Sequence, residues 1–574
     1  MHRSAARVLT ALATVLVVAA PAPVRASSTP TADALAPTPQ LLSGVLPDVG
    51  SGLAYHGRLY FAGNTASSGR ELWVTDGTAA GTHLVVDLSP GPDSSSPHEL
   101  VVFDDRLYFA AATATTGYEW FSTDGTAAGT QLLRDIYPGE NSSLPGSAVV
   151  AAGALWFAAF TPEDGRELWI SDGTPAHTHE VVDLASGSTS ANPSELTSLG
   201  DRVVFSATNS SLAAKPWVAQ PGQPVRRLDT LDPTVNLRPH QLTALGQHVV
   251  FTAGRDGQDG EEPWVTDGVP GDARELADIN PGPAASSPFP LTVAGGQVWF
   301  AATTPGEGAE LWRSDGTTAG TVLVKDVRPG VASSFISTVV GAGDRLFFNA
   351  NDGVHGVELW TASSADGARL VLDAVPGPGD GTSNGFDGLA SAVGPLVVYA
   401  GTDAGGTEPW VSDGTPAGTH RVADLAPGPS SSAPYAVGVL GGTVFFFART
   451  NSESGLWAWT ASTDSGTPGQ VPAPRASTAV AHVKRHYPAS RARHRRIRVP
   501  VSVTATGGGV LTGGTVTLVD RGHVIGSAAL VGGTAHVRIT KRLRAHHRYH
   551  VRAHWSGNPT ASASTSRPVT VRIR

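Results

Sequence analysis

Acidic residues in one Gly-rich loop are the first candidates for chemistry in this sequence. Asp256 and Asp259 flank Gly257, and Glu261 and Glu262 follow directly. Carboxylate oxygens of this kind are the ligands that Ca²⁺ prefers. The spacing matches no complete EF-hand loop. We therefore expect a solvated hairpin loop here, with a calcium site as the alternative.

Other catalytic patterns give little support for an enzyme. A glycosidase needs two carboxyl groups facing each other across a pocket, and 49 acidic residues spread along the chain leave such a pair open. The 19 histidines form no H-E-x-x-H pair, and no Gly-x-Ser-x-Gly occurs as a strand-turn-helix elbow. We expect no enzyme, and we assign no catalytic residue, no cofactor and no metal ligand.

A single aromatic position recurs through most of the chain and organises the fold. Successive copies are 47 to 50 residues apart, a period typical of propeller blades. The copies are Trp73, Phe121, Trp169, Trp217, Trp264, Trp312, Trp360, Trp410 and Trp457.

Each repeat contains four short β-prone runs. In the second repeat they cover 99–103, 107–112, 118–123 and 131–136, and turn residues separate them. Four such strands predict one antiparallel blade. Because strand direction alternates, the longer loops 112–117 and 138–146 should lie on one face of the ring, which is where we expect any ligand.

The repeated Asp-Gly and Trp residues are interpreted as structural. In Asp76-Gly77 and its equivalents, the Asp side chain can accept a backbone amide two residues on, and Gly tolerates positive φ. We prefer this turn-fixing role to metal binding. The Trp should fill the wedge between neighbouring blades.

Exceptions to the motif carry information. Pro216, Pro263 and Pro409 replace the Leu before the Trp, which predicts that this position is a strand start. The fourth repeat has Lys215 in place of the Glu and lacks the Asp-Gly-Thr. Such degeneracy favours a packing role for the motif.

These residues resemble the E-L-W-x-x-D-G-T repeat family of extracellular bacterial proteins, over roughly residues 50 to 460. The turn is also similar to the Asp-box of sialidase-type propellers, although here Asp and Gly are adjacent. Neither resemblance implies a catalytic residue. We expect an all-β fold with a β-propeller over 40–471. If residues 40–46 supply the outer strand of the last repeat, nine blades close; eight blades or an open arc are the alternatives.

The two ends of the chain differ from the repeats. Arg3, Arg7 and an apolar run up to Ala20 predict a signal peptide over 1–26, and hence a secreted, extracellular protein. We see no other apolar segment long enough to span a membrane. The chain has no cysteine, so disulfides cannot contribute to stability.

Charge divides the chain sharply. Residues 1–474 hold 22 Lys/Arg and 48 Asp/Glu, whereas 475–574 hold 18 Lys/Arg and the single acid Asp520. Segment 472–498 is expected to be a basic Pro/Ala-rich linker. Residues 499–574 alternate like a sandwich and resemble bacterial Ig-like repeat domains, through segments such as 514–518 and 555–558.

The expected function follows from these features. We expect a secreted, non-enzymatic repeat protein that acts as an extracellular binding or structural module near the cell envelope. Its partner would be a glycan or an anionic cell-wall polymer, with no sequence-specific reading of nucleic acid. The alternative is a carbohydrate-active enzyme, a glycoside hydrolase or lyase, with paired carboxylates at the mouth of the propeller channel. The sequence does not specify the oligomeric state.

Overall fold

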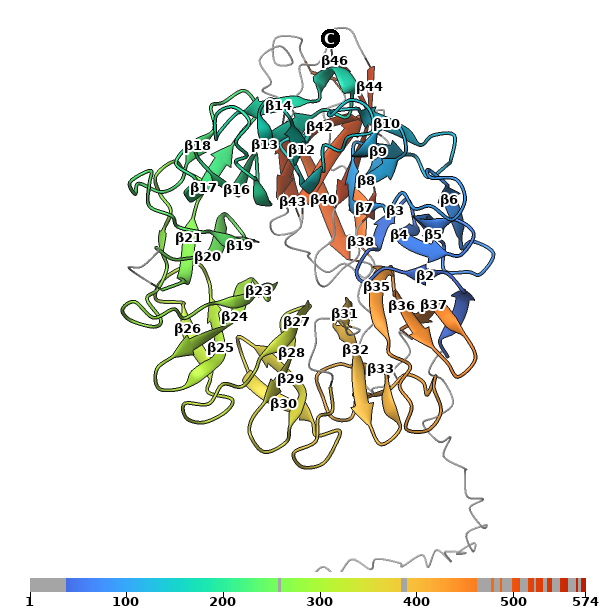
Figure 1. Ribbon diagram of the computed structural model, residues 1–574, viewed down its shortest axis with the longest axis vertical. Coiled ribbons are helices and arrows are strands. Elements are labelled where there is room, and N and C mark those ends of the chain that lie inside the picture. Colours follow the sequence, from blue (N-terminus) through green and yellow to red (C-terminus); the bar gives the residue numbers. More distant parts are fainter. Residues whose placement is uncertain are drawn as a thin grey trace, which may run out of the picture. The chain divides into compact units, whose positions relative to one another are not determined.

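A computed structural model shows that the repeats form nine antiparallel sheets arranged in a ring (Figure 1). The structure describes residues 38–461 except 256–259 and 383–389, and beyond residue 461 it describes strands only. The prediction of a nine-bladed all-β propeller is confirmed, and the eight-bladed and open alternatives are wrong. Apart from strands, the described residues contain one 3₁₀ turn, η2 (Pro175–His177).

The innermost strand of each blade lies nearest the ring axis. Each contacts the inner strands of both neighbouring blades, and β35 contacts β3, so the ring is closed. The nine inner strands are β3 (Leu53–Tyr55), β7 (His98–Phe103), β11 (Gly146–Ala151), β15 (Ser194–Leu199), β19 (His240–Leu245), β23 (Phe289–Ala294), β27 (Ser337–Ala342), β31 (Ala390–Val393) and β35 (Tyr435–Leu440).

Two long strands form the middle of every blade. The second strands are β4 (Arg58–Thr65), β8 (Arg106–Thr113), β12 (Ala154–Thr161), β16 (Arg202–Thr208), β20 (His248–Ala253), β24 (Gln297–Thr304), β28 (Arg345–Asn351), β32 (Leu396–Asp403) and β36 (Thr443–Arg449). The third strands, which carry the repeated Trp, are β5 (Gly69–Thr75), β9 (Gly117–Thr123), β13 (Gly165–Ser171), β17 (Ala214–Ala219), β21 (Glu262–Thr266), β25 (Gly308–Ser314), β29 (Val357–Ser363), β33 (Gly406–Ser412) and β37 (Ser454–Thr460).

The outermost strands are short. They are β6 (His83–Val86), β10 (Gln131–Arg134), β14 (His179–Val182), β18 (Arg226–Arg227), β22 (Arg274–Glu275), β26 (Val322–Lys325), β30 (Gly367–Leu372) and β34 (His420–Arg421). In the first blade β2 (Leu46–Pro47) also pairs with β4.

The ninth blade takes its outer strand from the start of the propeller. Strand β1 (Gln40–Ser43) pairs antiparallel with β37, with Gln40 opposite Ala458 and Leu41 opposite Trp457. Blade nine is therefore built from both ends of the propeller segment. This is the strand exchange that the sequence predicted.

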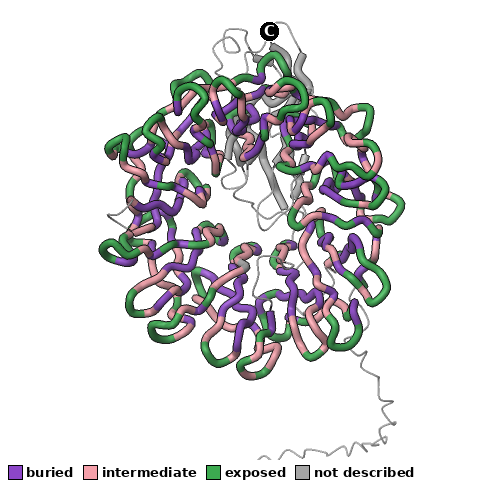
Figure 2. Tube along the Cα trace, viewed as in Figure 1, coloured by how far each residue is buried: buried purple, intermediate pink, exposed green. Residues whose placement is uncertain are grey.

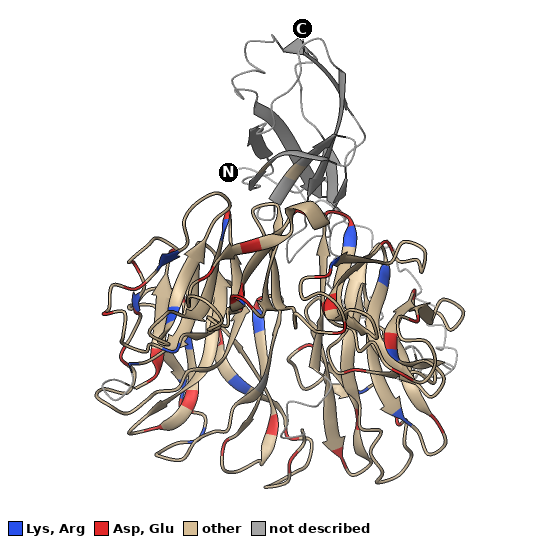
Figure 3. Cartoon of the chain, turned by 45° about the horizontal axis from the view of Figure 1, so that its top comes forward, with Lys and Arg blue, Asp and Glu red and all other residues tan. Residues whose placement is uncertain are grey.

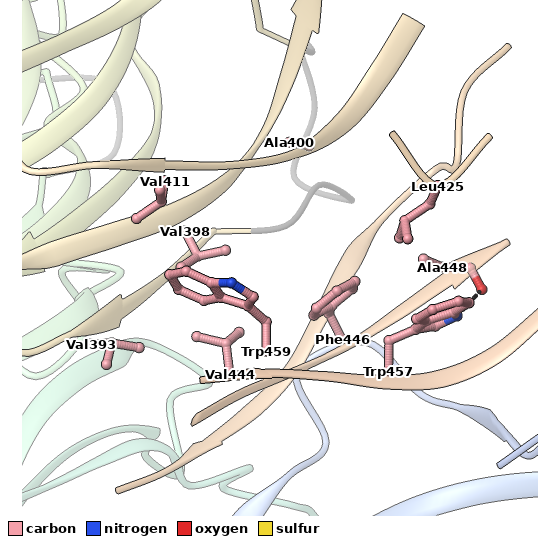
Figure 4. Packing of buried hydrophobic residues seen from close by; sticks show 10 residues of the cluster. All are labelled: Val393, Val398, Ala400, Val411, Leu425, Val444, Phe446, Ala448, Trp457 and Trp459. Carbon is pink, nitrogen blue, oxygen red and sulfur yellow. Dashed lines mark hydrogen bonds between the residues drawn. The ribbon is translucent and has the colours of Figure 1, made fainter. Parts of the chain in front are cut away.

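The core lies between blades, because each sheet packs its apolar faces on its neighbours (Figure 2). The repeated aromatic residue contacts the preceding blade in every case. Trp457, for example, clusters with Leu425 of blade eight and donates an indole hydrogen bond of 3.0 Å to the Ala448 carbonyl (Figure 4). The predicted wedge role is confirmed.

The prediction that the three prolines begin strands is wrong for two of them. Pro216 and Pro409 lie inside β17 and β33. Their effect is on the outer strand, which has two residues in the three Pro-containing blades and at least four where Leu is present. The proline carbonyl still accepts a bond from the strand that follows, as in Val422 N to Pro409 O at 2.7 Å. Because proline has no N–H to donate to the outer strand, that strand is shorter in these blades. The proline does not determine where the third strand begins.

Strands also occur beyond residue 461. They are β38 (Ala476–Ala479), β39 (His486–Tyr487), β40 (Arg498–Ala505), β41 (Thr515–Asp520), β42 (His523–Ala529), β43 (Thr534–Arg538), β44 (Arg548–Trp555), β45 (Ser564–Thr565) and β46 (Val569–Ile573). Two of them, β38 and β39, fall in the segment predicted to be a linker and pair with β40 and β46. The predicted signal peptide lies outside the described residues. Within the described part of the chain, no helix is long and apolar enough to span a bilayer.

Candidate functional site

The Asp-Gly turns join the third and fourth strands. In blade two, Asp124 Oδ1 accepts the Thr126 backbone N–H at 3.0 Å and the Thr126 hydroxyl at 2.8 Å. Gly125 has φ of 95°. The Thr126 hydroxyl also accepts the Gly129 N–H at 3.0 Å, and a Cβ on Gly129 would lie 2.1 Å from the Asp124 carboxylate. The turn-fixing role of the motif is confirmed.

These contacts hold the turn aspartates ionised. The hydrogen bond from the Thr hydroxyl is the main cause that lowers the pKa of Asp76, Asp124, Asp172 and Asp315 below the usual value. Their acceptor capacity serves the turn, and in the described residues no three acidic or His side chains are grouped so that they could hold a metal ion. Figure 3 shows Asp and Glu spread over strands and loops around the ring.

The long loops lie on one face, as predicted. The Tyr118 N–H donates to Ser142 Oγ at 2.9 Å, which ties the start of β9 to the loop that leads to blade three. A Cβ on Gly117 would lie 2.1 Å from the Asn141 carbonyl, so the two loops touch. We call this side of the propeller the crossover face, and the side with the Asp-Gly turns the turn face.

A buried glutamate fastens the crossover loop that follows seven of the nine blades. In blade two, Glu119 Oε1 accepts the backbone N–H groups of Tyr137 and Ser143, both at 3.1 Å, and Oε2 accepts the Ser143 hydroxyl at 2.7 Å. One carboxylate thus grips both ends of the loop. We call this arrangement the glutamate clamp. It occurs at the Glu of the repeat motif in six blades: Glu71, Glu119, Glu167, Glu262, Glu310 and Glu358. The seventh, Glu408, is also buried but among the described residues accepts only the Leu425 and Ala426 N–H groups at the first end of its loop.

Burial has the largest effect on the pKa of the clamp glutamates. Desolvation raises the pKa of Glu119, Glu167, Glu310 and Glu358 to about 7, and the hydrogen bonds from the loop oppose this shift only in part. The sequence analysis missed this role. A signal was present, because a residue with a small side chain lies 24 positions after each of these glutamates, usually Ser.

The fourth blade has the opposite charge at the clamp position. Lys215 is fully buried, and its Nζ lies 3.4 Å from Asp229 Oδ1 and 3.0 Å from the Asp232 carbonyl. Asp229 lies at the beginning of that crossover loop, two residues after β18. The lysine therefore fastens the loop by donating hydrogen bonds to oxygen atoms of the loop, whereas the glutamates accept hydrogen bonds from its N–H and hydroxyl groups.

Immediately after the clamp, the chain enters the inner strand through a left-handed residue. Seven such residues have φ between 46° and 55°. They are Ser96, Leu144, Asn192, Arg238, Ser287, Phe335 and Ala433, which we call the rim. None is glycine, although this conformation costs an L-residue roughly 1–2 kcal/mol. Backbone strain of this kind persists where the surrounding structure enforces it, and it gathers at functional positions.

Rim residues share a conformation but not a chemical type. The residue before each of them is buried, whereas the rim side chain is partly or fully exposed. Leu144 is 57% exposed and Phe335 is 60% exposed. A fixed backbone that presents different exposed side chains can provide recognition, since packing does not require any of these identities. The rim is the candidate site.

The candidate calcium loop is not supported as a site. Asp256 and Asp259 lie outside the described residues. Glu262 is a clamp residue, and its carboxylate accepts the Ile279 and Ser286 N–H groups, both at 2.9 Å. Glu261 Oε1 lies 3.9 Å from the Arg238 guanidinium.

A carboxyl pair does occur, but not near the ring axis. Glu180, on the outer strand β14, shares a hydrogen bond with Asp164. Burial, and then the charge of Asp164, raise the pKa of Glu180 to about 7. Glu180 is on the outermost strand of its blade and Asp164 is in the loop between β12 and β13, so the pair does not match the paired carboxylates expected at a channel mouth.

The fold and the family comparison together define the class of protein. The chain is a nine-bladed propeller followed by an Ig-like domain, and residues 487–574 match the family described as bacterial Ig-like domain (group 3). No curated protein matches the chain in sequence.

Solved structures similar to this chain contain propellers. A prolyl endopeptidase is 13% identical, with a TM-score of 0.37 over 64% of this chain and 54% of that one. Oligopeptidase B from Trypanosoma brucei is 11% identical, with a TM-score of 0.35 over 67% and 55% of the two chains. The propeller domain of the Trilobed protease from Pyrococcus furiosus is 10% identical, with a TM-score of 0.32 over 57% of this chain and 98% of that domain.

These neighbours correct the functional expectation. This chain spans about half the length of the first two peptidases, and at such identity the likeness concerns the fold alone. The neighbours are peptidases, so neither the expected non-enzymatic module near the cell envelope nor the carbohydrate-active enzyme given as the alternative has a counterpart among them. The part that is matched is a non-catalytic propeller domain.

Proposed function

We propose that the propeller binds extended polypeptide at the rim and thereby engages substrates for proteolysis. One observation carries the proposal. The inner edge of β35 accepts main-chain hydrogen bonds from the segment that leads into β3, Gly50 N to Ala436 O and Gly52 N to Val437 O, both at 2.8 Å. An inner strand of this propeller can therefore hold a peptide main chain.

The other inner strands offer the same kind of edge. Each is paired with one strand of its own sheet, and among the described residues none receives a main-chain bond like those on β35. Unpaired strand edges bind peptides by adding a strand, while side-chain contacts select the sequence. Rim side chains lie at the start of these strands, where they can make that selection.

The proposed setting is extracellular, on the basis of the predicted signal peptide at 1–26. Binding of the basic segment after residue 475 to an anionic polymer also stays a prediction. Neither is needed for polypeptide binding at the rim.

The test uses the secreted full chain and a fluorescently labelled, permanently unfolded polypeptide. We expect saturable binding in an anisotropy titration, and weaker binding when Leu144 and Phe335 are both replaced by Ser. Val269→Ser is the matched control, because Val269 is 51% exposed and follows the Asp-Gly turn of blade five on the turn face. Equal loss in both variants, or no binding, would overturn the proposal. Mass spectrometry of the same mixtures reports any cleavage.

A further inference from the structure

One sector of the crossover face is more apolar than the rest. Val331 is 78% exposed, Val354 is 63% exposed and Phe335 is 60% exposed. Val331 and Phe335 lie in the crossover into blade seven, and Val354 lies in the loop between β28 and β29 of the same blade. Large apolar side chains with this exposure cost solubility, so a cluster of three indicates a contact surface.

The repeat architecture does not require these side chains. Residues at the place of Phe335 in other blades include Ser96, Asn192 and Ser287. The place of Val331, four residues earlier, is taken by Pro92 and Ser188 in blades one and three. Among the described rim residues, Leu144 is the one other large apolar residue at the place of Phe335, so the combination with Val331 and Val354 sets this sector apart.

A cation lies beside Phe335 and close to the loop that carries Val354. The Arg328 guanidinium carbon is 5.8 Å from the Phe335 ring centroid, and a Cβ on Gly353, next to Val354, would lie 3.4 Å from Arg328 Nε. Arg328 donates one long bond of 3.5 Å to the Ser333 carbonyl. Among the described residues no carboxylate lies within ion-pair distance of it, so its positive charge is not neutralised locally.

We propose that this sector binds the C-terminal end of a polypeptide whose last residue is apolar. The Arg328 guanidinium would pair with the terminal carboxylate, for which its planar donors are suited, and the last side chain would rest between Phe335, Val331 and Val354. An internal apolar segment would satisfy the apolar residues but leave Arg328 without an anion. This inference rests on the proposed polypeptide binding and names its ligand.

The test compares two labelled hexapeptides, Gly-Ser-Gly-Ser-Gly-Phe with a free carboxylate and the same peptide with a C-terminal amide. Full-length variants are Phe335→Ser and Arg328→Asn, which place in the crossover into blade seven the residues of the preceding crossover into blade six, Ser287 and Asn280. Leu212→Ser is the matched control, since Leu212 is 63% exposed in the loop between β16 and β17 and is not a rim residue. Thermal melts establish that each variant is folded.

We expect amidation, Phe335→Ser and Arg328→Asn each to weaken binding about tenfold, and Leu212→Ser to leave it unchanged. Equal binding of the two peptides, or equal effects of Phe335→Ser and Leu212→Ser, would overturn the inference while polypeptide binding at the rim stands. If the unfolded polypeptide binds and neither hexapeptide does, the inference fails alone. If nothing binds, the proposed function fails as well.

Discussion

Lys215 takes the place of the clamp glutamate in the fourth blade, and its Nζ lies 3.4 Å from Asp229 Oδ1 with both side chains buried. The other blades with a clamp fasten the crossover loop with a carboxylate that accepts N–H groups. Here the same loop is fastened by an ammonium group that donates to Asp229 and to the Asp232 carbonyl. The clamp position therefore requires a buried polar group that matches its loop, not a particular charge.

Restoring the motif in blade four should destabilise the protein. Lys215→Glu would bury a second carboxylate beside Asp229, and breaking a buried pair typically costs about 3–5 kcal/mol in free energy of unfolding. Urea unfolding monitored by Trp fluorescence measures this loss. Adding Asp229→Ser to Lys215→Glu should recover part of it. A single variant as stable as the wild type would contradict the pairing.

The clamp should hold the rim in place. Glu119→Gln puts an amide NH₂ where the Ser143 hydroxyl or a loop N–H now donates, which leaves a buried donor unpaired at a cost of about 1–3 kcal/mol. Amide hydrogen exchange should rise at residues 143–146 and stay unchanged in the Asp-Gly turn of the same blade. Uniform change across the blade would argue that Glu119 stabilises the sheet rather than the loop.

The clamps also predict how stability depends on pH. Glu119, Glu167, Glu310 and Glu358 have pKa values raised to about 7 from an ordinary 4.5. Between these values the carboxyls are protonated in the folded chain and ionised in the unfolded chain, so unfolding releases protons. Stability should therefore fall as pH rises from 4.5 to 7. Urea midpoints at successive pH values measure the slope, and Glu119→Gln should make it shallower.

Closure of the ring depends on β1. Removing residues 1–43 exposes the outer edge of β37 and leaves Trp457 without the opposing Leu41. We expect a lower thermal midpoint, and association of chains through the free edge, visible by light scattering. Removing residues 1–37 keeps β1 and is the matched control. Identical melting of the two truncated chains would show that β1 does not close the ring.

Much of the fold was predictable because its signals are local and repeated. The regular spacing of the Trp residues predicts the number and length of the blades. Asp124-Gly125-Thr126 predicts a turn whose hydrogen bonds all join residues close together in the sequence. The clamp is harder to read, since Glu119 and Ser143 are 24 residues apart and neither type by itself indicates the contact. The rim could not be predicted, because the left-handed conformation of Leu144 is imposed by the buried residues on either side and not by Leu itself.

The most direct test of the account is a hydrogen-exchange footprint of the full chain with a bound unfolded polypeptide. The account predicts slower exchange at the rim and along the free edges of the inner strands, with the Asp-Gly turns of the turn face unaffected. Protection confined to the turn face, or no change at the inner strands at saturating polypeptide, would contradict it.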